Sequence, residues 1–317
     1  MPFNPFDAAV ENDGYHWWYV DAISDDGRQA VTVILFVGSV FSPYYARARR
    51  RGRGLPEEYC ALNVALYGDR GRWCMTERSA RSVTRTDRRF RIGPSEVTRE
   101  DDRLTFRIEE WAVPWPLRVR GTIEVKLPAN LPVSGQSLDR EERHWWQMLA
   151  PHTRVHVNME RPGSNWHGNA YVDCNWGTAP LSDAFRSWQW SRAHLADGST
   201  VVQYDVVTRA GDATSNTHRI GAQGEYAPFD GLTKRVDLER ARYWRMARHT
   251  RKDPLSSIDN LKTLEDSPFY SRSRFDTSID GLQAHCIHES LDLEQFDRRR
   301  VQILLPFRMP RNTLETN

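Results

Sequence analysis

The sequence has few cysteines, few lysines and no long apolar run. Its four cysteines are scattered over 317 residues without a Cys-x-x-Cys pair, so neither a zinc ribbon nor a disulfide framework is expected. We predict four buried free thiols in a protein from a reducing compartment. Residues 1–10 lack a basic segment followed by an apolar run, so no signal peptide is visible and we expect the chain in the cytoplasm.

The longest apolar stretch, at residues 31–41, is interrupted by Thr32, Gly38 and Ser39. A membrane-spanning helix needs about 20 apolar residues, so this stretch is predicted to be a buried strand. The mean hydropathy is −0.68, and the chain also holds twelve Trp, eleven Tyr and twelve Phe. This combination indicates a polar exterior around an interior rich in aromatic rings, which could shelter an apolar ligand.

Lysine is rare because almost all basic residues are arginines. One dense cluster consists of Arg47, Arg49, Arg50, Arg51 and Arg53. Arginine binds phosphate groups through two parallel hydrogen bonds, so this cluster could contact anionic headgroups of a membrane. A solvated loop explains it as well. No nucleic-acid-binding motif accompanies the cluster, and nucleic acid is not expected as a partner.

Short runs of alternating or β-branched residues, bounded by turn-forming residues, recur along the chain. They lie at residues 15–21, 30–37, 59–67, 104–109, 117–127, 153–159, 187–194, 200–208 and 301–307. This spacing predicts an all-β barrel or sandwich. Only residues 42–51 and 256–265 show a modest helical pattern.

The clearest linker signal is the Pro-, Gly- and Ser-containing segment 128–137. We expect one domain at residues 1–135 and a second at residues 136–317. Each part contains a His-Trp-Trp sequence, which begins at His16 in the first and at His144 in the second. Two related barrels would explain this similarity, and so would coincidence in a chain rich in tryptophan.

Most catalytic signatures are missing from the sequence. It contains no Gly-x-Ser-x-Gly elbow, Walker loop, GxGxxG, HExxH or EF-hand loop. His152 and His156 would share one face of a strand, but no convincing Cys or carboxylate partner accompanies them. A metal site is therefore not predicted.

Residues 166–176 alternate between polar and apolar side chains. In a strand, successive side chains point to opposite faces. One face would then carry His167, Asn169, Tyr171, Asp173 and Asn175. This polar face could look at solvent, or it could line the cavity of a barrel.

Six blocks, in the same order over nearly the whole chain, resemble the carotenoid 1,2-hydratase (hydroxyneurosporene synthase) family. The blocks lie at residues 13–27, 38–45, 145–155, 171–177, 288–291 and 304–310. The resemblance implies two tandem lipocalin-like antiparallel β-barrels, the second carrying a Tyr-x-Asp pair. It also implies a cofactor-free enzyme, a hydro-lyase that hydrates the terminal 1,2 double bond of acyclic carotenoids such as neurosporene and lycopene.

In that family a His-x-Trp pair and a Tyr-x-Asp pair are implicated in activity. They match His144 with Trp146 and Tyr171 with Asp173. A trisubstituted alkene is a poor base, so its hydration needs a strong and well-placed acid. Protonation at C2 leaves a tertiary cation at C1, which water captures. Asp173 is the expected acid, and an apolar or anionic pocket would have to raise its pKa.

The other three residues have expected roles beside this acid. Trp146 and Tyr171 offer aromatic faces to the cation. His144 could orient water or return a proton, because the ordinary pKa of histidine lies near neutral pH. Structural roles are the alternatives: His144 as a hydrogen-bonded residue near the linker, and Trp146 as packing between the barrels.

Asp21 competes with Asp173 for the role of acid. It shares a predicted face with three aromatic residues, Tyr15, Trp17 and Tyr19, a setting that could perturb a carboxyl group even more. The residues alone do not choose between the two carboxyl groups. The resemblance favours Asp173.

Two other functions compete with the hydratase. A non-catalytic lipocalin-like carrier of a hydrophobic pigment would use the same aromatic cavity without an acid. A related cofactor-free hydratase or cyclase would act on another isoprenoid. A hydratase must collect its insoluble substrate from a bilayer, so the arginine cluster, flanked by Phe41, Tyr44 and Tyr45, is a candidate for peripheral membrane contact.

Overall fold

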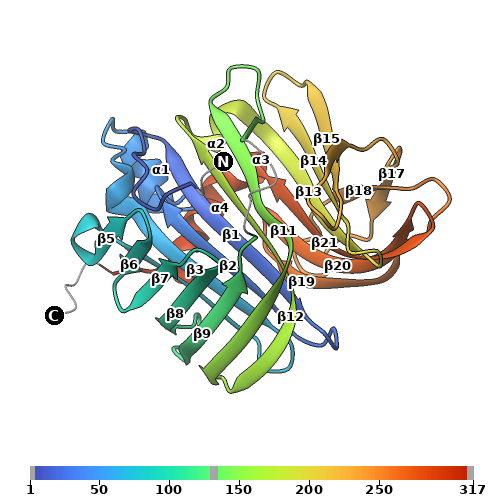
Figure 1. Cartoon of the computed structure of the whole chain (residues 1–317). Coiled ribbons are helices and arrows are strands. Elements are labelled where there is room, and N and C mark those ends of the chain that lie inside the picture. Colours follow the sequence, from blue (N-terminus) through green and yellow to red (C-terminus); the bar gives the residue numbers. More distant parts are fainter. Residues whose placement is uncertain (1–3, 129–134, 313–317) are drawn as a thin grey trace. The chain divides into compact units, whose positions relative to one another are not determined.

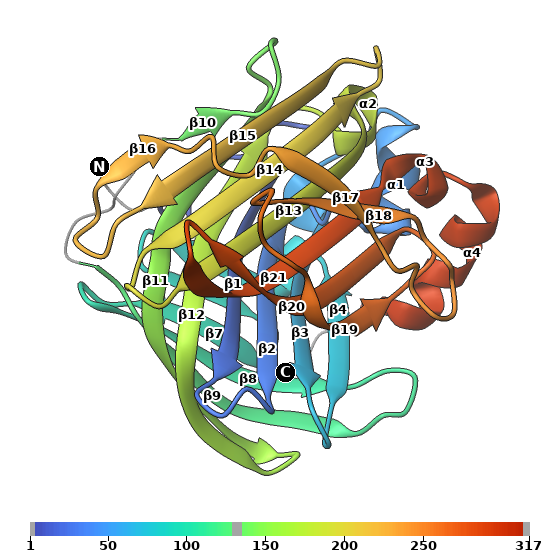
Figure 2. The same ribbon diagram turned by 90° about the vertical axis from the view of Figure 1, so that its right-hand side faces the viewer.

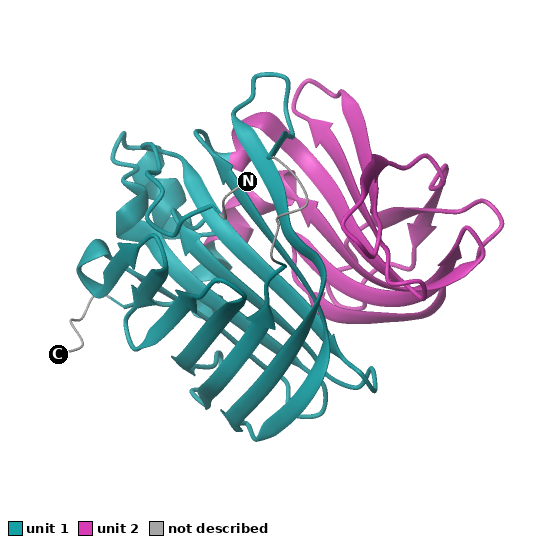
Figure 3. Cartoon of the chain, viewed as in Figure 1, with its two compact units in different colours: residues 1–180, 303–317 teal, residues 181–302 magenta. Residues whose placement is uncertain are grey.

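The computed structural model of the chain describes residues 4–128 and 135–312. Two compact units make up the chain (Figure 3). Unit 1 comprises residues 1–180 and 303–317, and unit 2 comprises residues 181–302.

Unit 1 contains one curled sheet (Figure 1). Its strands are β1 (Tyr15–Ser24), β2 (Ala30–Val37), β3 (Cys60–Tyr67), β4 (Arg72–Arg78), β5 (Val83–Thr86), β6 (Arg89–Ile92), β7 (Ser95–Arg99), β8 (Arg103–Trp111), β9 (Arg118–Lys126), β10 (Gln136–Ser137), β11 (His144–Arg161), β12 (Ser164–Gly177) and β22 (Arg311–Asn312). Their order is β22-β4-β3-β2-β1-β12-β11-β9-β8-β7-β6-β5, with β10 beside β11. Strand β22 runs parallel to β4, whereas the other paired strands are antiparallel.

One face of this sheet forms the apolar core of unit 1. Alternate residues of β1 and β12, such as Val20 and Val172, lie in the same cluster of buried side chains as Phe106 of β8 and Val119 of β9. Strands from distant positions in the sheet share this cluster because the sheet curls around its apolar side (Figure 1).

Short helices complete unit 1. The helix α1 (Pro43–Arg49) begins after Ser42, whose hydroxyl accepts a hydrogen bond from the backbone N–H of Tyr45, and proline at the first position suits a helix start. This confirms the helix expected at residues 42–51. The 3-10 helices η1 (Pro56–Tyr59) and η2 (Ala80–Ser82) connect strands. Residues 303–308 of α4 (Arg299–Arg308) also belong to unit 1.

Unit 2 contains a second antiparallel sheet (Figure 2). In spatial order its strands are β16 (Tyr226–Pro228), β15 (Ala213–Ile220), β14 (Thr200–Thr208), β13 (Phe185–Leu195), β21 (Leu282–Asp292), β20 (Tyr270–Ile279) and β19 (Asp259–Asp266). The strands β17 (Lys234–Leu238) and β18 (Arg248–Lys252) form a separate pair. The helix α2 (Leu181–Ala184) precedes β13, and the helix α3 (Leu293–Phe296) follows β21. A smaller apolar core includes Leu195, Val201 and Phe275.

The mostly-β expectation is confirmed, and two local predictions are wrong. Residues 301–307 lie in α4, not in a strand. There Val301 and Leu305 are buried four positions apart, as on one face of a helix, whereas Phe307 is exposed. Residues 256–265 overlap β19, not a helix, because pairing with β20 decides their conformation.

The expected boundary after residue 135 requires correction. Most of the linker segment 128–137 lies outside the described residues, but the strands on either side of it pair directly, with Val155 of β11 opposite Val125 of β9. Residues 136–180 therefore extend the sheet of unit 1, and the compact units divide after Pro180. Both His-Trp-Trp sequences lie in this sheet, on the two strands that flank β12.

Candidate active site

The residues singled out from the sequence lie on three adjacent strands, β1, β12 and β11. Trp146 lies opposite Asn175, and His144 lies opposite Gly177. Residues that are directly opposite share a face of the sheet. We call this side the site face; its members are Tyr15, Trp17, Tyr19, Asp21, Thr32, His144, Trp146, Tyr171, Asp173 and Asn175.

The site face points away from the apolar core of unit 1. On β12 the core receives Ala170, Val172 and Cys174, which alternate with the residues of the site face. Tyr171 and Asp173 are nevertheless buried, with exposed fractions of 0% and 4%. The polar ladder therefore looks at solvent only at its His167 end, and from Tyr171 to Asn175 it is buried on the side of the sheet opposite the core.

Asp173 accepts two hydrogen bonds on the same oxygen. The indole N–H of Trp146 and the hydroxyl of Tyr171 each lie 2.9 Å from Oδ2. Such donors stabilise the ionised form of a carboxyl group, whereas burial stabilises its neutral form. Because Oδ2 already receives both donors, Oδ1 is the oxygen that would carry the proton of the neutral acid.

Tyr171 is a neutral hydrogen-bond donor in this cluster. Burial raises the pKa of Tyr171 well above its ordinary value of 10, and the charges of Asp173 and Asp21 raise it further. The phenol therefore keeps its proton near neutral pH and directs it to Asp173. The structure gives Trp146 a similar role, because its N–H is directed to the same oxygen.

Asp21 joins the same cluster from β1. It is fully buried and lies opposite Tyr171, while Tyr19 lies opposite Asp173. The hydroxyl of Tyr19 lies 3.1 Å from Oδ2 of Asp21. The two carboxyl groups are diagonal neighbours on one face of the sheet, a position that corresponds to about 7–8 Å between Cα atoms.

His144 occupies another part of the site face. Its Nδ1 lies 3.0 Å from the hydroxyl of Tyr15, and its backbone N–H donates to Oδ1 of Asp139. It lies opposite Gly177, four positions along β12 from Asp173, which corresponds to about 13 Å of strand. Burial lowers the pKa of His144 to about 4. Burial therefore favours the neutral imidazole at pH 7.

Gly177 makes room for this contact. A Cβ atom at this position would lie 2.8 Å from Nδ1 of His144 and 2.8 Å from the ring of Tyr15. In the sequence, Gly177 stands at the end of the block at residues 171–177 with no expected role of its own. Its function is steric and depends on which strands lie beside β12.

The histidines considered as metal ligands do not form a metal site in the described residues. The ring of His156 stacks on His167 with centroids 4.3 Å apart. Over residues 4–128 and 135–312, no group of three or more His, Cys, Asp or Glu side chains is arranged to hold a metal ion.

In the same residues no helix is long and apolar enough to span a bilayer. All four cysteines are free and buried, as predicted.

Comparison with known proteins gives this arrangement a family context. Residues 33–316 match the family model described as carotenoid hydratase CrtC. The chain belongs to the carotenoid hydratase family. It is 46% identical over 307 residues to the acyclic carotenoid 1,2-hydratase of Thiocapsa roseopersicina, covering 96% of this chain and 75% of the relative. The enzyme of the same name from Rubrivivax gelatinosus is 42% identical over 309 residues, with the same coverage.

A solved structure supports the fold of this carotenoid hydratase family member. It is the structure of a putative AttH from Nitrosomonas europaea, with a TM-score of 0.65 and 16% identity, covering 92% of this chain and 96% of that one. The family match includes His144, Trp146, Tyr171 and Asp173, whereas Asp21 precedes the matched residues. The sequence signal that could have linked Asp21 to the site is the repeated triplet Tyr-Val-Asp.

Proposed function

We propose that this chain is an acyclic carotenoid 1,2-hydratase, a hydro-lyase that adds water across the terminal C1–C2 double bond of neurosporene or lycopene. The relatives at 46% and 42% identity bear that name. The observation that supports the chemistry is the buried carboxyl group of Asp173, which accepts hydrogen bonds from Trp146 and Tyr171 on one oxygen.

In the proposed reaction Asp173 is the acid. It transfers the proton on Oδ1 to C2 of the alkene, and a tertiary cation forms at C1. Negative charge then develops on the carboxylate, where the two donors on Oδ2 bind it more strongly than they bind the neutral acid. Because these hydrogen bonds strengthen as the proton leaves, they lower the barrier to protonation.

The rest of the site face would stabilise the cation and position water. The rings of Tyr15 and Trp17 stack with centroids 4.9 Å apart, and aromatic faces attract a desolvated cation. His144, which is neutral, would act through hydrogen bonds and not as a positive charge. Water then bonds to C1 and loses one proton, so that the product gains one molecule of water. The reaction requires no organic cofactor.

We further propose that the two units are tandem lipocalin-like barrels. The support is that each unit has its own antiparallel sheet and its own apolar core. In this arrangement the catalytic residues lie on the side of β11 and β12 that faces away from the core of unit 1.

A peripheral contact with the membrane is also part of the proposal, because acyclic carotenoids dissolve in bilayers and not in water. The arginine cluster around α1 offers exposed side chains at Arg47, Arg50, Arg51 and Arg53, whereas Arg49 packs over the ring of Tyr45 at 4.4 Å.

The decisive experiment is anaerobic incubation of the purified protein with lycopene in detergent and deuterated water, followed by mass spectrometry. We expect the wild type to form a 1-hydroxy product with deuterium at C2, and Asp173→Asn to form none. Asp101→Asn is the matched control, because the Asp101 side chain is 87% exposed. Tight pigment binding without product from the wild type would favour a carrier, and equal turnover by Asp173→Asn would exclude Asp173 as the acid.

A further inference from the structure

Two copies of the triplet Tyr-Val-Asp pair with each other on the site face, one on β1 and one on β12. Tyr19 lies opposite Asp173, and Asp21 lies opposite Tyr171. In each copy the tyrosine hydroxyl donates to Oδ2 of the aspartate two positions further on, at 3.1 Å and 2.9 Å. Antiparallel pairing therefore creates two similar Tyr–Asp pairs related by an approximate two-fold axis.

The neighbouring strands break this symmetry. Next to β12, β11 supplies Trp146, whose N–H donates to Asp173. Next to β1, β2 places Thr32 directly opposite Asp21. The Thr32 hydroxyl is buried and has no hydrogen-bond partner within the described part of the chain. A buried polar group normally has a partner, so this hydroxyl indicates a place for a water molecule beside Asp21.

The groups next to the two carboxyl groups suit them to different tasks. The donor from Trp146 stabilises Asp173 after it has lost a proton, which suits an acid. The place for water between Asp21 and Thr32 suits Asp21 to accept a proton from the attacking water.

We propose that Asp21 is the base of the hydration reaction and that Thr32 helps it to hold the attacking water. As the water oxygen bonds to C1, one water proton passes to Asp21, while C2 has received the proton of Asp173. The product has then gained H and OH. A proton passes from Asp21 back to Asp173 through water and restores the starting state. This inference rests on the proposed hydratase function.

Deuterium exchange separates this role from a structural one. In Asp21→Asn, Asp173 still protonates C2, but the cation returns a proton to the Asp173 carboxylate instead of capturing water. We expect hydroxylated product to fall on the order of a hundredfold, while deuterium still enters recovered lycopene. Asp173→Asn should lose both signals. Thr32→Val should slow hydration less than Asp21→Asn does.

Two results would overturn the assignment. One is an Asp21→Asn variant that hydrates lycopene as fast as the wild type does. The other is an Asp21→Asn variant that loses both deuterium exchange and hydration although its melting temperature is unchanged. Asp101→Asn serves again as the control. Failure of the wild type itself to form any hydroxylated product would contradict the proposed function and not the pairing of the two triplets.

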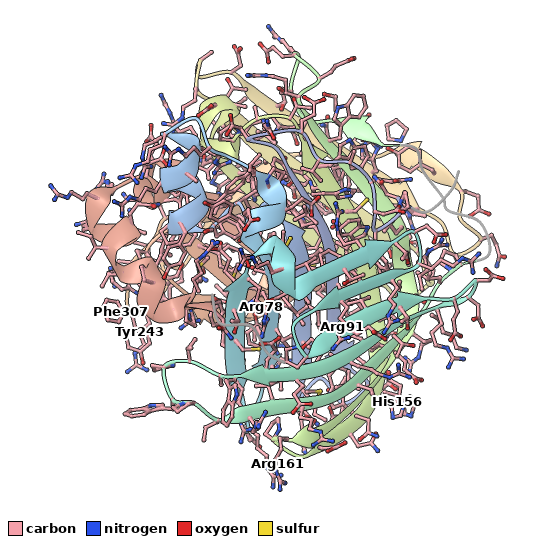
Figure 4. All side chains as sticks on the ribbon, turned by 90° about the vertical axis from the view of Figure 1, so that its left-hand side faces the viewer. Arg78, Arg91, His156, Arg161, Tyr243 and Phe307 are labelled. Carbon is pink, nitrogen blue, oxygen red and sulfur yellow. The ribbon has the colours of Figure 1, made fainter. Side chains whose placement is uncertain are left out.

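A separate observation concerns an exposed apolar surface on unit 1. The turn between β8 and β9 exposes Trp115 to 74%, and α4 exposes Phe307 to 76%; Phe307 projects from the edge of the molecule in Figure 4. Trp73 connects the two, because its carbonyl accepts the N–H of Val113 in the turn and its ring lies 4.2 Å from the guanidinium of Arg308. We call this the Trp–Phe surface; its exposed apolar members are Trp111, Trp115, Leu117, Ile303, Leu304 and Phe307.

The charges of the Trp–Phe surface are mainly positive. Arg118 lies over the ring of Trp111 at 4.0 Å and pairs with Glu109, Arg72 donates to the Arg118 carbonyl, and Arg308 lies over Trp73. Exposed tryptophan and phenylalanine next to arginine suit the interface of an anionic bilayer, where aromatic rings enter the headgroup region and cations meet phosphates.

We also infer that the Trp–Phe surface docks on a bilayer containing anionic lipid. The test is flotation with vesicles of phosphatidylcholine and phosphatidylglycerol, compared with phosphatidylcholine alone. Combined Trp115→Ser and Phe307→Ser substitutions should weaken binding on the order of tenfold. They should also reduce hydration of lycopene in vesicles but not in detergent. Leu255→Ser is the matched control, because Leu255 is an isolated apolar residue that is 97% exposed.

Three results would overturn this inference. Unchanged vesicle binding by the double variant would remove the surface from membrane contact. Loss of binding only after charge reversal of Arg47, Arg50 and Arg51 would assign docking to the arginine cluster. Weaker self-association in sedimentation together with unchanged vesicle binding would assign the Trp–Phe surface to contact between copies of the chain.

Discussion

The hydroxyl of Tyr15 lies 3.0 Å from Nδ1 of His144, although the two residues are 129 positions apart in the sequence. Each lies opposite Gly177, one from β1 and the other from β11. Their rings are stacked at an interplanar angle of 20°. The strand order β1-β12-β11 thus brings both side chains together above a residue that has none.

Gly177→Ala should disturb this contact. The new methyl group would lie within 2.8 Å of both rings, and overpacking of this kind costs about 1–3 kcal/mol of folding free energy. We expect a lower urea midpoint and reduced turnover, because His144 is displaced. Tyr15→Phe is the companion variant, since it removes the hydroxyl without crowding. Unchanged stability and turnover in Gly177→Ala would contradict the steric role of the glycine.

Tyr171→Phe and Trp146→Phe should each slow hydration without unfolding the protein. Each variant removes one donor to Oδ2 of Asp173, and a hydrogen bond to a charged group contributes about 1.5–3 kcal/mol. Turnover should therefore fall roughly tenfold to a hundredfold. Tyr226→Phe is the control, because it removes a hydroxyl that lies 2.7 Å from Nδ1 of His218 in unit 2. If these variants kept full turnover, the two donors would have no part in proton transfer.

Buried histidines should make the folded protein less stable as the pH falls. Burial lowers the pKa of His16 to about 3, with the charge of Arg85 as a second cause, and lowers the pKa of His144 to about 4. The unfolded chain therefore takes up protons first as the pH falls below about 6.5. Each histidine then costs up to about 1.4 kcal/mol per pH unit until its folded pKa is reached. Above pH 6.5 this loss is absent.

His16→Phe tests this prediction. His16 stacks on Trp18 with centroids 4.0 Å apart, a contact that phenylalanine can retain without accepting a proton. The pH of the acid unfolding midpoint should be lower in the variant, while stability at pH 8 changes little. An unchanged acid midpoint would show that His16 does not contribute to acid unfolding.

A buried ion pair offers a test of the core of unit 1. Nη2 of Arg78, which is labelled in Figure 4, lies 2.9 Å from Oε2 of Glu110, and both side chains are at most 7% exposed. Ser95 donates to the other oxygen of Glu110. Arg78→Met should destabilise the protein by about 3–5 kcal/mol, because it leaves a buried charge without its partner. Adding Glu110→Gln should recover part of that loss in thermal unfolding, and equal stability of the single and double variants would contradict this explanation.

Much of the secondary structure could be predicted from the sequence. The alternation at residues 15–21 and 200–208 corresponds to β1 and β14, and the proline after Ser42 marks the start of α1. The failures occurred where local pattern and tertiary context compete. Residues 301–307 have the composition of a strand but bury Val301 and Leu305 on one face of a helix.

The candidate site was predictable only in part. The resemblance identified Tyr171 and Asp173, and the structure places their side chains in contact. It did not identify Asp21, which reaches the same cluster through the pairing of β1 with β12. Nor could composition show that the pKa of His144 is lowered, because the cause is burial by residues distant in the chain.

The sequence by itself determined the family, the β-rich architecture and the chemical types available at the site, because these depend on residue identity and on spacing along one strand. The tertiary structure alone decided the order of the strands, the side of the sheet on which Asp173 lies, and the meeting of Tyr15 with His144 over Gly177. These features depend on hydrogen bonding and burial between segments more than a hundred residues apart, and the local pattern of residues does not specify which distant strand becomes a neighbour.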